Sequence, residues 1–236
     1  MSDRSEGLKI FSTLGVVGVL GELLPEYERA AGIRIEMVYE PTKKLQERIA
    51  AGETADAAIL TGEAIDELTQ QGVLASDWRV DLARSFVGVA VGAGKPRPEI
   101  GTVEAFKRTL LEAKTIAYSK AGASGIFFAG LIQRLGLAEA VNAKATIIPS
   151  GFTGELLLKG EVEIAIQQIS ELMAVPGIDI VGRLPAEIQA DTIFSAGLFP
   201  ASDRQDAAAA FLRAISGPET AEVYTRLGLE PIAQAG

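Results

Sequence analysis

The sequence contains no cysteine and no histidine among its 236 residues. These absences exclude disulfides, thiolate nucleophiles, the usual zinc sites and serine–histidine triads. No apolar run approaches the roughly 18 residues of a membrane span, so we expect a chain that is not embedded in a membrane. No low-complexity tract or block of like charge indicates disorder. We expect neither a metal ion nor a cofactor.

Positive charge is also scarce, with 22 lysines and arginines against 31 acidic residues and a net charge of −9. Nucleic-acid binding needs a basic surface, so nucleic acid is excluded as a partner. A small anion is not excluded, because a pocket needs only two or three local donors. With 48% hydrophobic residues, the chain can bury a sizeable core as one large domain or two modest lobes. We expect a monomer.

The first residues, "MSDRSEGLKIF", are polar and lack the apolar core of a signal peptide. Two explanations are open. Either the protein is cytoplasmic, or the sequence is a mature chain whose export segment has been removed, in which case the protein is periplasmic.

Short apolar runs alternate with longer helical patterns along most of the chain. This alternation is typical of βαβ units built on a parallel sheet. The predicted strands cover residues 8–12, 33–39, 55–60, 115–119, 144–150 and 190–199, and residues 84–98 are an extended crossing that is apolar and β-branched and then turn-rich. The predicted helices cover residues 19–32, 41–52, 62–72, 124–136 and the region 203–227, and residues 153–172 are predicted to form a helix–strand–helix unit. Glycines at 32, 72 and 136 are expected to end three of these helices.

The segments 52–68 and 160–172 share a Gly-Glu start, an Ala-Ile pair and a Glu-Leu end, which is a weak internal repeat. The repeat predicts two similar α/β lobes. We expect one lobe of residues 1–84 plus 198–236 and a second lobe of residues 85–197. The expected fold is therefore α/β with two Rossmann-like lobes, a hinge, and a ligand cleft between the lobes.

The chain resembles the type II periplasmic solute-binding proteins, specifically the molybdate-binding group. The resemblance rests on "LKIFSTLGVVGVLGELLPEYERAAGIRIEM", "ERIAAGETADAAILTGEAIDELTQQGVL", "LKGEVEIAIQQISEL" and "AAAAFLRAISGPETAEVYTRLGLEP". It covers essentially the whole chain and implies the periplasmic-binding-protein type II fold. It also implies that an oxyanion is bound by serine hydroxyls and backbone N–H groups in four loops.

All four loops depart from the molybdate pattern. Gly15 stands where the first loop has a serine, and Thr42 replaces a serine next to two added lysines. Lys120 stands at a usual acidic position, and Gln168 corresponds to a usual tyrosine. Added ammonium groups suit a ligand with two or three carboxylates, or a phosphate plus a carboxylate. We therefore expect an organic polyanion rather than molybdate.

The candidate ligand-binding residues share a position at the end of a predicted strand or the start of a predicted helix. They are Ser12, Thr13, Thr42, Lys43, Ser119, Lys120, Ser124, Gly125, Ser150, Gly151, Phe152 and Gln168. Simpler interpretations stay open: Ser124 caps a helix, Lys43 is a solvated surface lysine, Ser12 and Thr13 bond to a local turn, and Phe152 belongs to the core.

The first functional hypothesis is a solute-binding protein that captures a di- or tricarboxylate or an oxyanion, with an ABC permease complex as a possible partner. The alternative is an enzyme similar to aconitate isomerase, which moves a proton along an allylic framework and needs a base. Without histidine, that base has to be Lys120, Lys43, Tyr118 or a carboxylate such as Glu171.

Overall fold

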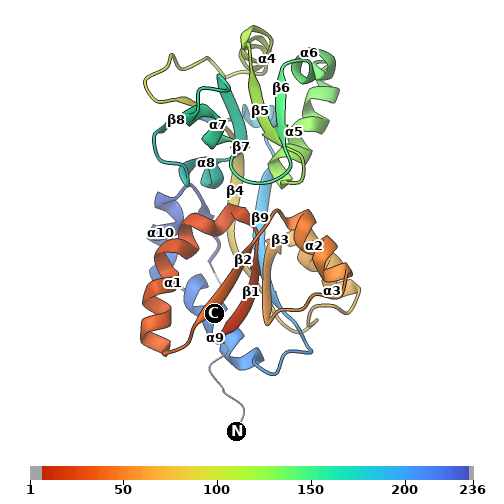
Figure 1. The fold of residues 1–236 in the computed structure, drawn as a ribbon, viewed down its shortest axis with the longest axis vertical. Coiled ribbons are helices and arrows are strands. Elements are labelled where there is room, and N and C mark those ends of the chain that lie inside the picture. The colour runs from red at the N-terminus through yellow and green to blue at the C-terminus, as the bar shows by residue number, and fades with distance from the viewer. Residues whose placement is uncertain (1–6, 234–236) are drawn as a thin grey trace. The chain divides into compact units, whose positions relative to one another are not determined.

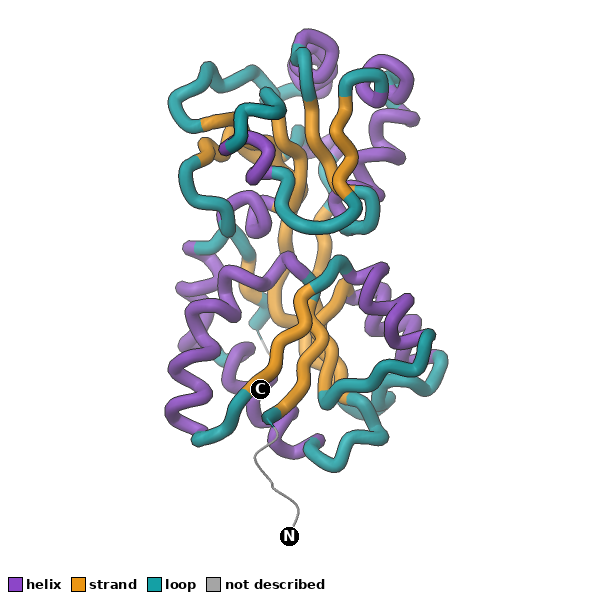
Figure 2. The backbone as a smooth tube through the Cα atoms, in the orientation of Figure 1, coloured by secondary structure: helices purple, strands orange, loops and turns teal. Residues whose placement is uncertain are grey.

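The computed structural model describes residues 7–233, which form two compact units (Figure 1). Unit 1 holds the described residues up to Arg84 and those from Ile193 onward, and unit 2 holds Ser85–Thr192. The chain passes between the units twice, inside strand β4 (Arg79–Gly92) and inside strand β9 (Asp191–Leu198), both orange in Figure 2. The second boundary lies five residues before the expected one, because β9 already pairs with unit 1 from Phe194 onward.

The sheet of unit 1 begins with three parallel strands in the order β2, β1, β3. Their bounds are Leu8–Ser12 for β1, Ile35–Tyr39 for β2 and Ala57–Thr61 for β3. β9 adds to β3 in the antiparallel direction, and β10 (Glu230–Pro231) pairs with the first part of β4. The predicted strands at 8–12, 33–39 and 55–60 are confirmed.

Helices cover both faces of this sheet (Figure 1). They are α1 (Val17–Ala31), α2 (Thr42–Ala50), α3 (Gly62–Gln70), α9 (Gln205–Ser216) and α10 (Ala221–Arg226), with short 3-10 turns at Leu14–Val16 and Pro218–Thr220. Gly32 ends α1 with a left-handed φ of 65°. The single region predicted at 203–227 is two helices, since the Gly217-Pro218 pair interrupts it.

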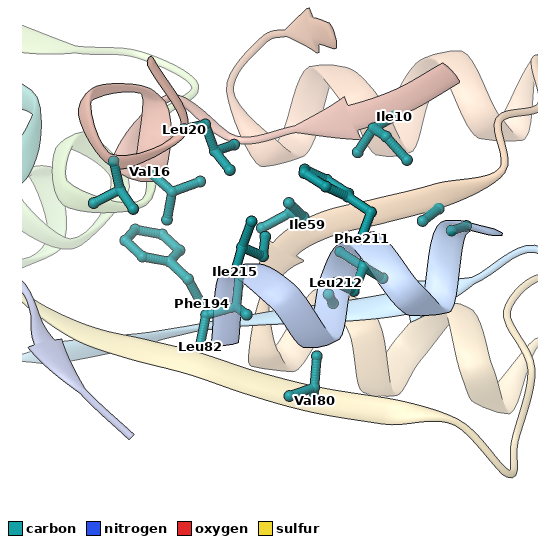
Figure 3. Close-up of a cluster of buried hydrophobic side chains, with 14 of the residues drawn as sticks. Ile10, Val16, Leu20, Ile59, Val80, Leu82, Phe194, Phe211, Leu212 and Ile215 are labelled. Atoms are coloured by element: carbon teal, nitrogen blue, oxygen red, sulfur yellow. The ribbon is translucent and has the colours of Figure 1, made fainter. Parts of the chain in front are cut away.

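The core of unit 1 follows the alternation of side chains along its strands (Figure 3). Ile10 and Ile59 point to the face covered by α1 and α9, where they pack with Phe194 and Phe211. Phe11, next to Ile10 in sequence, points to the opposite face, which α2 and α3 cover. β1 and β3 are therefore buried on both sides, which is typical of a parallel sheet.

Unit 2 repeats this organisation with strands in the order β4, β7, β5, β6. β5 (Ile116–Ser119), β6 (Ala145–Ile148) and β7 (Ile164–Gln168) are parallel, and β8 (Ile178–Arg183) pairs antiparallel with β4. The helices are α4 (Val103–Glu112), α5 (Ala123–Arg134), α6 (Ala138–Asn142), α7 (Gly154–Leu158) and α8 (Ile169–Met173), with a 3-10 turn at Ala186–Ile188.

Three elements of unit 2 are not among the sequence predictions: α4, α6 and β8. The start of α4 carries a readable signal, because the Thr102 hydroxyl accepts a hydrogen bond from the Ala105 N–H at 3.1 Å. No helix within residues 7–233 has both the length and the apolar character needed to cross a membrane.

Candidate functional site

The carboxyl ends of β5, β6 and β7 lie at one edge of the unit 2 sheet. Ser119, the last residue of β5, is paired in register with Ile148, the last residue of β6. The next N–H, that of Lys120, donates to the Ile148 carbonyl at 2.8 Å. In open α/β sheets this is the edge at which ligands bind. Five predicted residues therefore gather here from three strands: Ser119, Lys120, Ser150, Gly151 and Gln168.

Helix α5 begins directly above the end of β5 because two glycines permit a close approach. A Cβ atom on Gly125 would lie 1.7 Å from the Ser119 carbonyl oxygen. A Cβ atom on Gly122 would lie 2.6 Å from the Ser119 hydroxyl and 4.0 Å from the Ser124 hydroxyl. Both serine hydroxyls therefore lie close to Gly122, at the N-terminal, positive end of the dipole of a 12-residue helix.

The interpretation of Ser124 as a helix cap is wrong. The N-cap of α5 is Gly122, and no side chain donates to or accepts from the first turn as a cap. Ser124 is the second residue of the helix, where its own N–H is among those left without an intrahelical partner. Its side chain is only 1% exposed, and its hydroxyl has no hydrogen-bond partner.

Two consecutive glutamines end β7 and have different roles. Gln167 holds the loop after β6: its Oε1 accepts from the N–H and the hydroxyl of Thr153 at 2.7 and 2.8 Å. Its Nε2 donates to the Gly151 carbonyl at 3.0 Å. Gly151 has a φ of 93°, which favours glycine in this loop. Gln167 is not among the residues predicted from the sequence, although two consecutive amides after a buried apolar run are a recognisable signal.

Gln168 is the N-cap residue of α8 and forms a capping box with Glu171. Its Nε2 donates to the Thr192 hydroxyl at 2.9 Å, whereas its Oε1 is buried without a partner. Its backbone N–H donates to the Glu171 carboxylate at 3.3 Å. The predicted residues Ser150, Gly151 and Phe152 lie in the neighbouring loop; Ser150 is exposed, and Phe152 is half-buried.

Glu171 is a buried carboxyl group next to this edge. Burial raises its pKa to about 7, although hydrogen bonds from the Gln168 N–H and the Gln167 side chain act in the opposite direction. Its side chain is 5% exposed. A carboxyl group in this range exchanges protons near neutral pH, which is the property of a general acid or base.

The carboxyl edge of the unit 1 sheet carries the other predicted residues. Ser12 is buried at the end of β1, and its hydroxyl donates to the Thr13 carbonyl at 3.1 Å, as in the simpler interpretation of a local turn bond. Thr42, the first residue of α2, is buried and its hydroxyl has no partner. Tyr39, paired with Ser12 in the sheet, was missed; burial raises its pKa to about 12, so it keeps its proton.

The glycine at position 15 has a structural cause. A Cβ atom there would lie 2.1 Å from Cζ of Phe194, a buried ring in the unit 1 core. The serine expected from the molybdate pattern therefore cannot fit without moving that ring. The departure of this loop from the pattern reflects packing in the core.

Unpartnered polar atoms concentrate at the two edges. Within residues 7–233, four buried side-chain oxygens have no hydrogen-bond partner, those of Thr42, Ser119, Ser124 and Gln168. All four belong to predicted ligand-binding residues. Buried polar groups are almost always paired, so these four oxygens are exceptions that need an explanation.

The proposed bases differ in their surroundings. Lys43 and Lys120 are exposed side chains. Tyr118 is excluded as a base, because its hydroxyl donates to Asn142 Oδ1 at 2.7 Å and its ring packs edge-on against Phe128. Of the four bases considered from sequence, Glu171 is the one with a buried environment and a pKa near 7.

Two pockets lie within single units, both away from these edges. One of about 600 Å³ lies at the amino ends of β1 and β3, around Lys9 and Asp56. The other, of about 690 Å³, lies at the amino ends of β5 and β7, around Thr115 and Ile164. Neither pocket contains a predicted ligand-binding residue. No cluster of acidic side chains within residues 7–233 is arranged to hold a metal ion.

Residues 8–230 match the family model of bacterial extracellular solute-binding proteins. The chain belongs to this family. Membership implies a location outside the cytoplasmic membrane. The resemblance inferred from the sequence is thereby confirmed.

Individual relatives agree with this assignment. An aconitate isomerase from a Pseudomonas species is 36% identical over 231 residues, which cover 95% of this chain and 88% of the relative. The periplasmic molybdate-binding protein of Azotobacter vinelandii has a TM-score of 0.79 at 16% identity, covering 96% of this chain and 100% of that one. The substrate-binding domain of a putative molybdenum ABC transporter from Clostridium difficile has a TM-score of 0.69 at 16% identity, covering 96% and 99%. The predicted fold class, α/β with two lobes of the periplasmic-binding-protein type, is confirmed.

Proposed function

We propose that this protein binds a small organic anion with two or three carboxylates, and that the carboxyl edge of the unit 2 sheet supplies a main part of the site. The observation that carries this proposal is the set of unpartnered buried atoms on Ser119, Ser124 and Gln168. The two hydroxyls can donate to a carboxylate, with the free N–H groups of the first turn of α5 beside them.

The donor and acceptor set favours a carboxylate ligand over a fully ionised oxyanion such as molybdate. Ser119 and Ser124 offer donors, whereas Gln168 Oε1 offers an acceptor. The partner of this acceptor has to carry a proton, either on the ligand or on a neighbouring group. Lys120, exposed beside Ser119, adds a cation at the rim that suits a second carboxylate. The edge of unit 1 offers a similar arrangement, with the buried Thr42 hydroxyl beside the exposed Lys43.

A second candidate function is isomerisation of an unsaturated tricarboxylate by an allylic proton shift. Two observations favour it: the 36% identical relative bears the name aconitate isomerase, and Glu171 is a buried carboxyl group with a pKa near 7 at the proposed site. In such a shift one C–H bond breaks as a base takes the proton, the double bond moves, and a proton returns at the other end of the allylic system. No oxidant or cofactor is needed.

For the transport function we propose a periplasmic location and an ABC permease complex as the partner. Family membership supports both, because extracellular solute-binding proteins act outside the cytoplasmic membrane. The net charge of −9 argues against nucleic acid as a partner, so the anionic partner that we propose is the small ligand.

The test is a thermal-shift screen with cis- and trans-aconitate, citrate, molybdate, sulfate and phosphate. A ligand at 100 times its dissociation constant stabilises the fold by about 2.7 kcal/mol. We expect a tricarboxylate to give the largest shift, and a larger shift from molybdate than from every carboxylate would overturn the proposal. Incubation with one aconitate isomer, followed by chromatography for the other, decides between binding alone and isomerisation.

A further inference from the structure

A buried hydrogen-bond network connects the proposed site to Glu171. Gln168 carries both the unpartnered Oε1 and the N–H that donates to the Glu171 carboxylate at 3.3 Å. Gln167, the preceding residue, donates to the Gly151 carbonyl at 3.0 Å in the loop after β6. An anion in contact with Gln168 therefore lies next to a buried carboxyl group.

We propose that ligand binding at this edge is accompanied by the uptake of one proton on the Glu171 carboxyl group. The inference rests on the proposed anion site. A second negative charge beside Glu171 disfavours its ionised form, because two like charges in a poorly solvated place repel each other. The bound anion therefore favours protonated Glu171, and by reciprocity protonated Glu171 favours the anion.

The charges on the surrounding elements do not compensate Glu171. It lies on α8, which packs against β7 and β8. α8 also contacts β4, through Ser170 with Ser85 and Ile169 with Gly88; residues 85–92 of β4 carry no charge, and Arg84 precedes them. β7 carries no charged residue. On β8, Asp179 accepts from the Gly94 N–H at 2.8 Å, and Arg183 lies over the Phe86 ring at 3.8 Å. The influences on the Glu171 pKa are burial and two uncharged donors, so no neighbouring cation holds the proton off.

The size of the effect follows from linkage. With a pKa of about 7 in the free protein, Glu171 is mostly protonated at pH 6 and mostly ionised at pH 8. If only the protonated form binds well, the affinity falls about tenfold between pH 6 and pH 8. The proton enters from solvent, so calorimetry detects it as a binding enthalpy that depends on the ionisation enthalpy of the buffer.

The experiment is isothermal titration calorimetry of the full chain with the tricarboxylate trans-aconitate. Titrations at pH 8 in Hepes and in Tris, neither of which is a candidate ligand, should differ in enthalpy by nearly the difference between the two buffers' ionisation enthalpies, because close to one proton is taken up. Between pH 6 and pH 8 the affinity should fall about tenfold. Glu171→Gln, which keeps an oxygen to accept from Gln168, should remove both effects. Glu155→Gln, at an exposed glutamate of α7 in the same unit, should retain both.

The outcomes are distinct for the two proposals. If no carboxylate binds at any pH, the proposed function fails. If trans-aconitate binds with the same enthalpy in both buffers, or with the same pH dependence in Glu171→Gln as in the unmodified protein, the anion site stands and proton uptake by Glu171 is refuted. The buffer comparison needs no variant, so it remains decisive even if Glu171→Gln folds poorly.

Discussion

Replacing Glu171 with glutamine should make the protein more stable at alkaline pH. Burial raises the pKa of this carboxyl group from its ordinary value of 4.5 to about 7. The group is therefore more easily protonated in the folded state than in the unfolded chain. Its contribution to stability is fully present below about pH 4.5 and is lost as the pH rises to about 7. Above that range the folded protein carries a buried charge at a constant cost.

The magnitude follows from the difference between the two pKa values, which corresponds to roughly 3 kcal/mol. Glutamine has the same shape, keeps an acceptor for the Gln168 N–H and cannot ionise. The free energy of unfolding of Glu171→Gln minus that of the unmodified protein should therefore be larger, in the direction of a more stable variant, by roughly 3 kcal/mol at pH 8 than at pH 4.5. Most of the change should occur between pH 5 and pH 7.

The assay has to report on unit 2. Trp78, the single tryptophan, packs in the core of unit 1, so its fluorescence is a poor probe of α8. Hydrogen exchange of the β5 and β7 amides, corrected for the intrinsic pH dependence of exchange, measures opening of unit 2 directly. The β1 and β3 amides of unit 1 serve as an internal control. A difference between variant and unmodified protein that stays the same from pH 4.5 to pH 8 would refute the reasoning.

Three further predictions concern the edge of unit 2. Lys120→Met should weaken tricarboxylate binding and reduce its salt dependence without changing the melting temperature. Lys159→Met, at another exposed lysine, should leave both the affinity and its salt dependence unchanged, and calorimetry at two salt concentrations tests this. Ser124→Ala should weaken binding but leave the free energy of unfolding equal or up to about 1 kcal/mol higher, because it removes an unpaired buried hydroxyl. Urea unfolding measures this, and a loss of about 1 kcal/mol would instead indicate that Ser124 caps the helix. Gly125→Ala should destabilise the protein by about 2 kcal/mol or more, since its Cβ would lie 1.7 Å from the Ser119 carbonyl, and an unchanged urea midpoint would contradict this packing.

The elements that the sequence predicts well are those with a strong local signal. The strand at residues 8–12 is a run of apolar and β-branched character, and Gly32 ends α1 in the left-handed conformation that glycine favours. α4 was missed although Thr102 at its N-cap and the amphipathic spacing of its residues are local helix signals. β8 is only partly buried along its length, so it has no continuous apolar run. β8 owes its place to pairing with β4, from Gly88 with Arg183 to Gly92 with Ile178.

The sequence predicts which residues form the candidate site, but not the hydrogen bonds that connect them. The family pattern marks Thr42, Ser119, Ser124 and Gln168, which are the residues with unpartnered buried oxygens. The pattern cannot reveal that Ser124 is the second residue of α5, two positions past the N-cap Gly122, because this depends on where the helix begins. Nor can it reveal the network through Gln167, whose partners are 14 and 16 positions away in sequence.

The buried carboxyl group bears on which of the two functions the chain performs. A protein that only captures an anion gains nothing from a negative charge beside its donors, since that charge weakens binding at neutral pH. A glutamine at position 171 would keep an acceptor for the capping box with Gln168 and avoid the cost of burying a charge. A proton shift, by contrast, needs a group that holds and releases a proton near pH 7, and that stays clear of cations which would keep it ionised. Glu171 meets both conditions, because its raised pKa arises from burial and its hydrogen-bond donors are uncharged. The chemistry of this one residue therefore favours proton transfer to or from a bound carboxylate as part of what the site does.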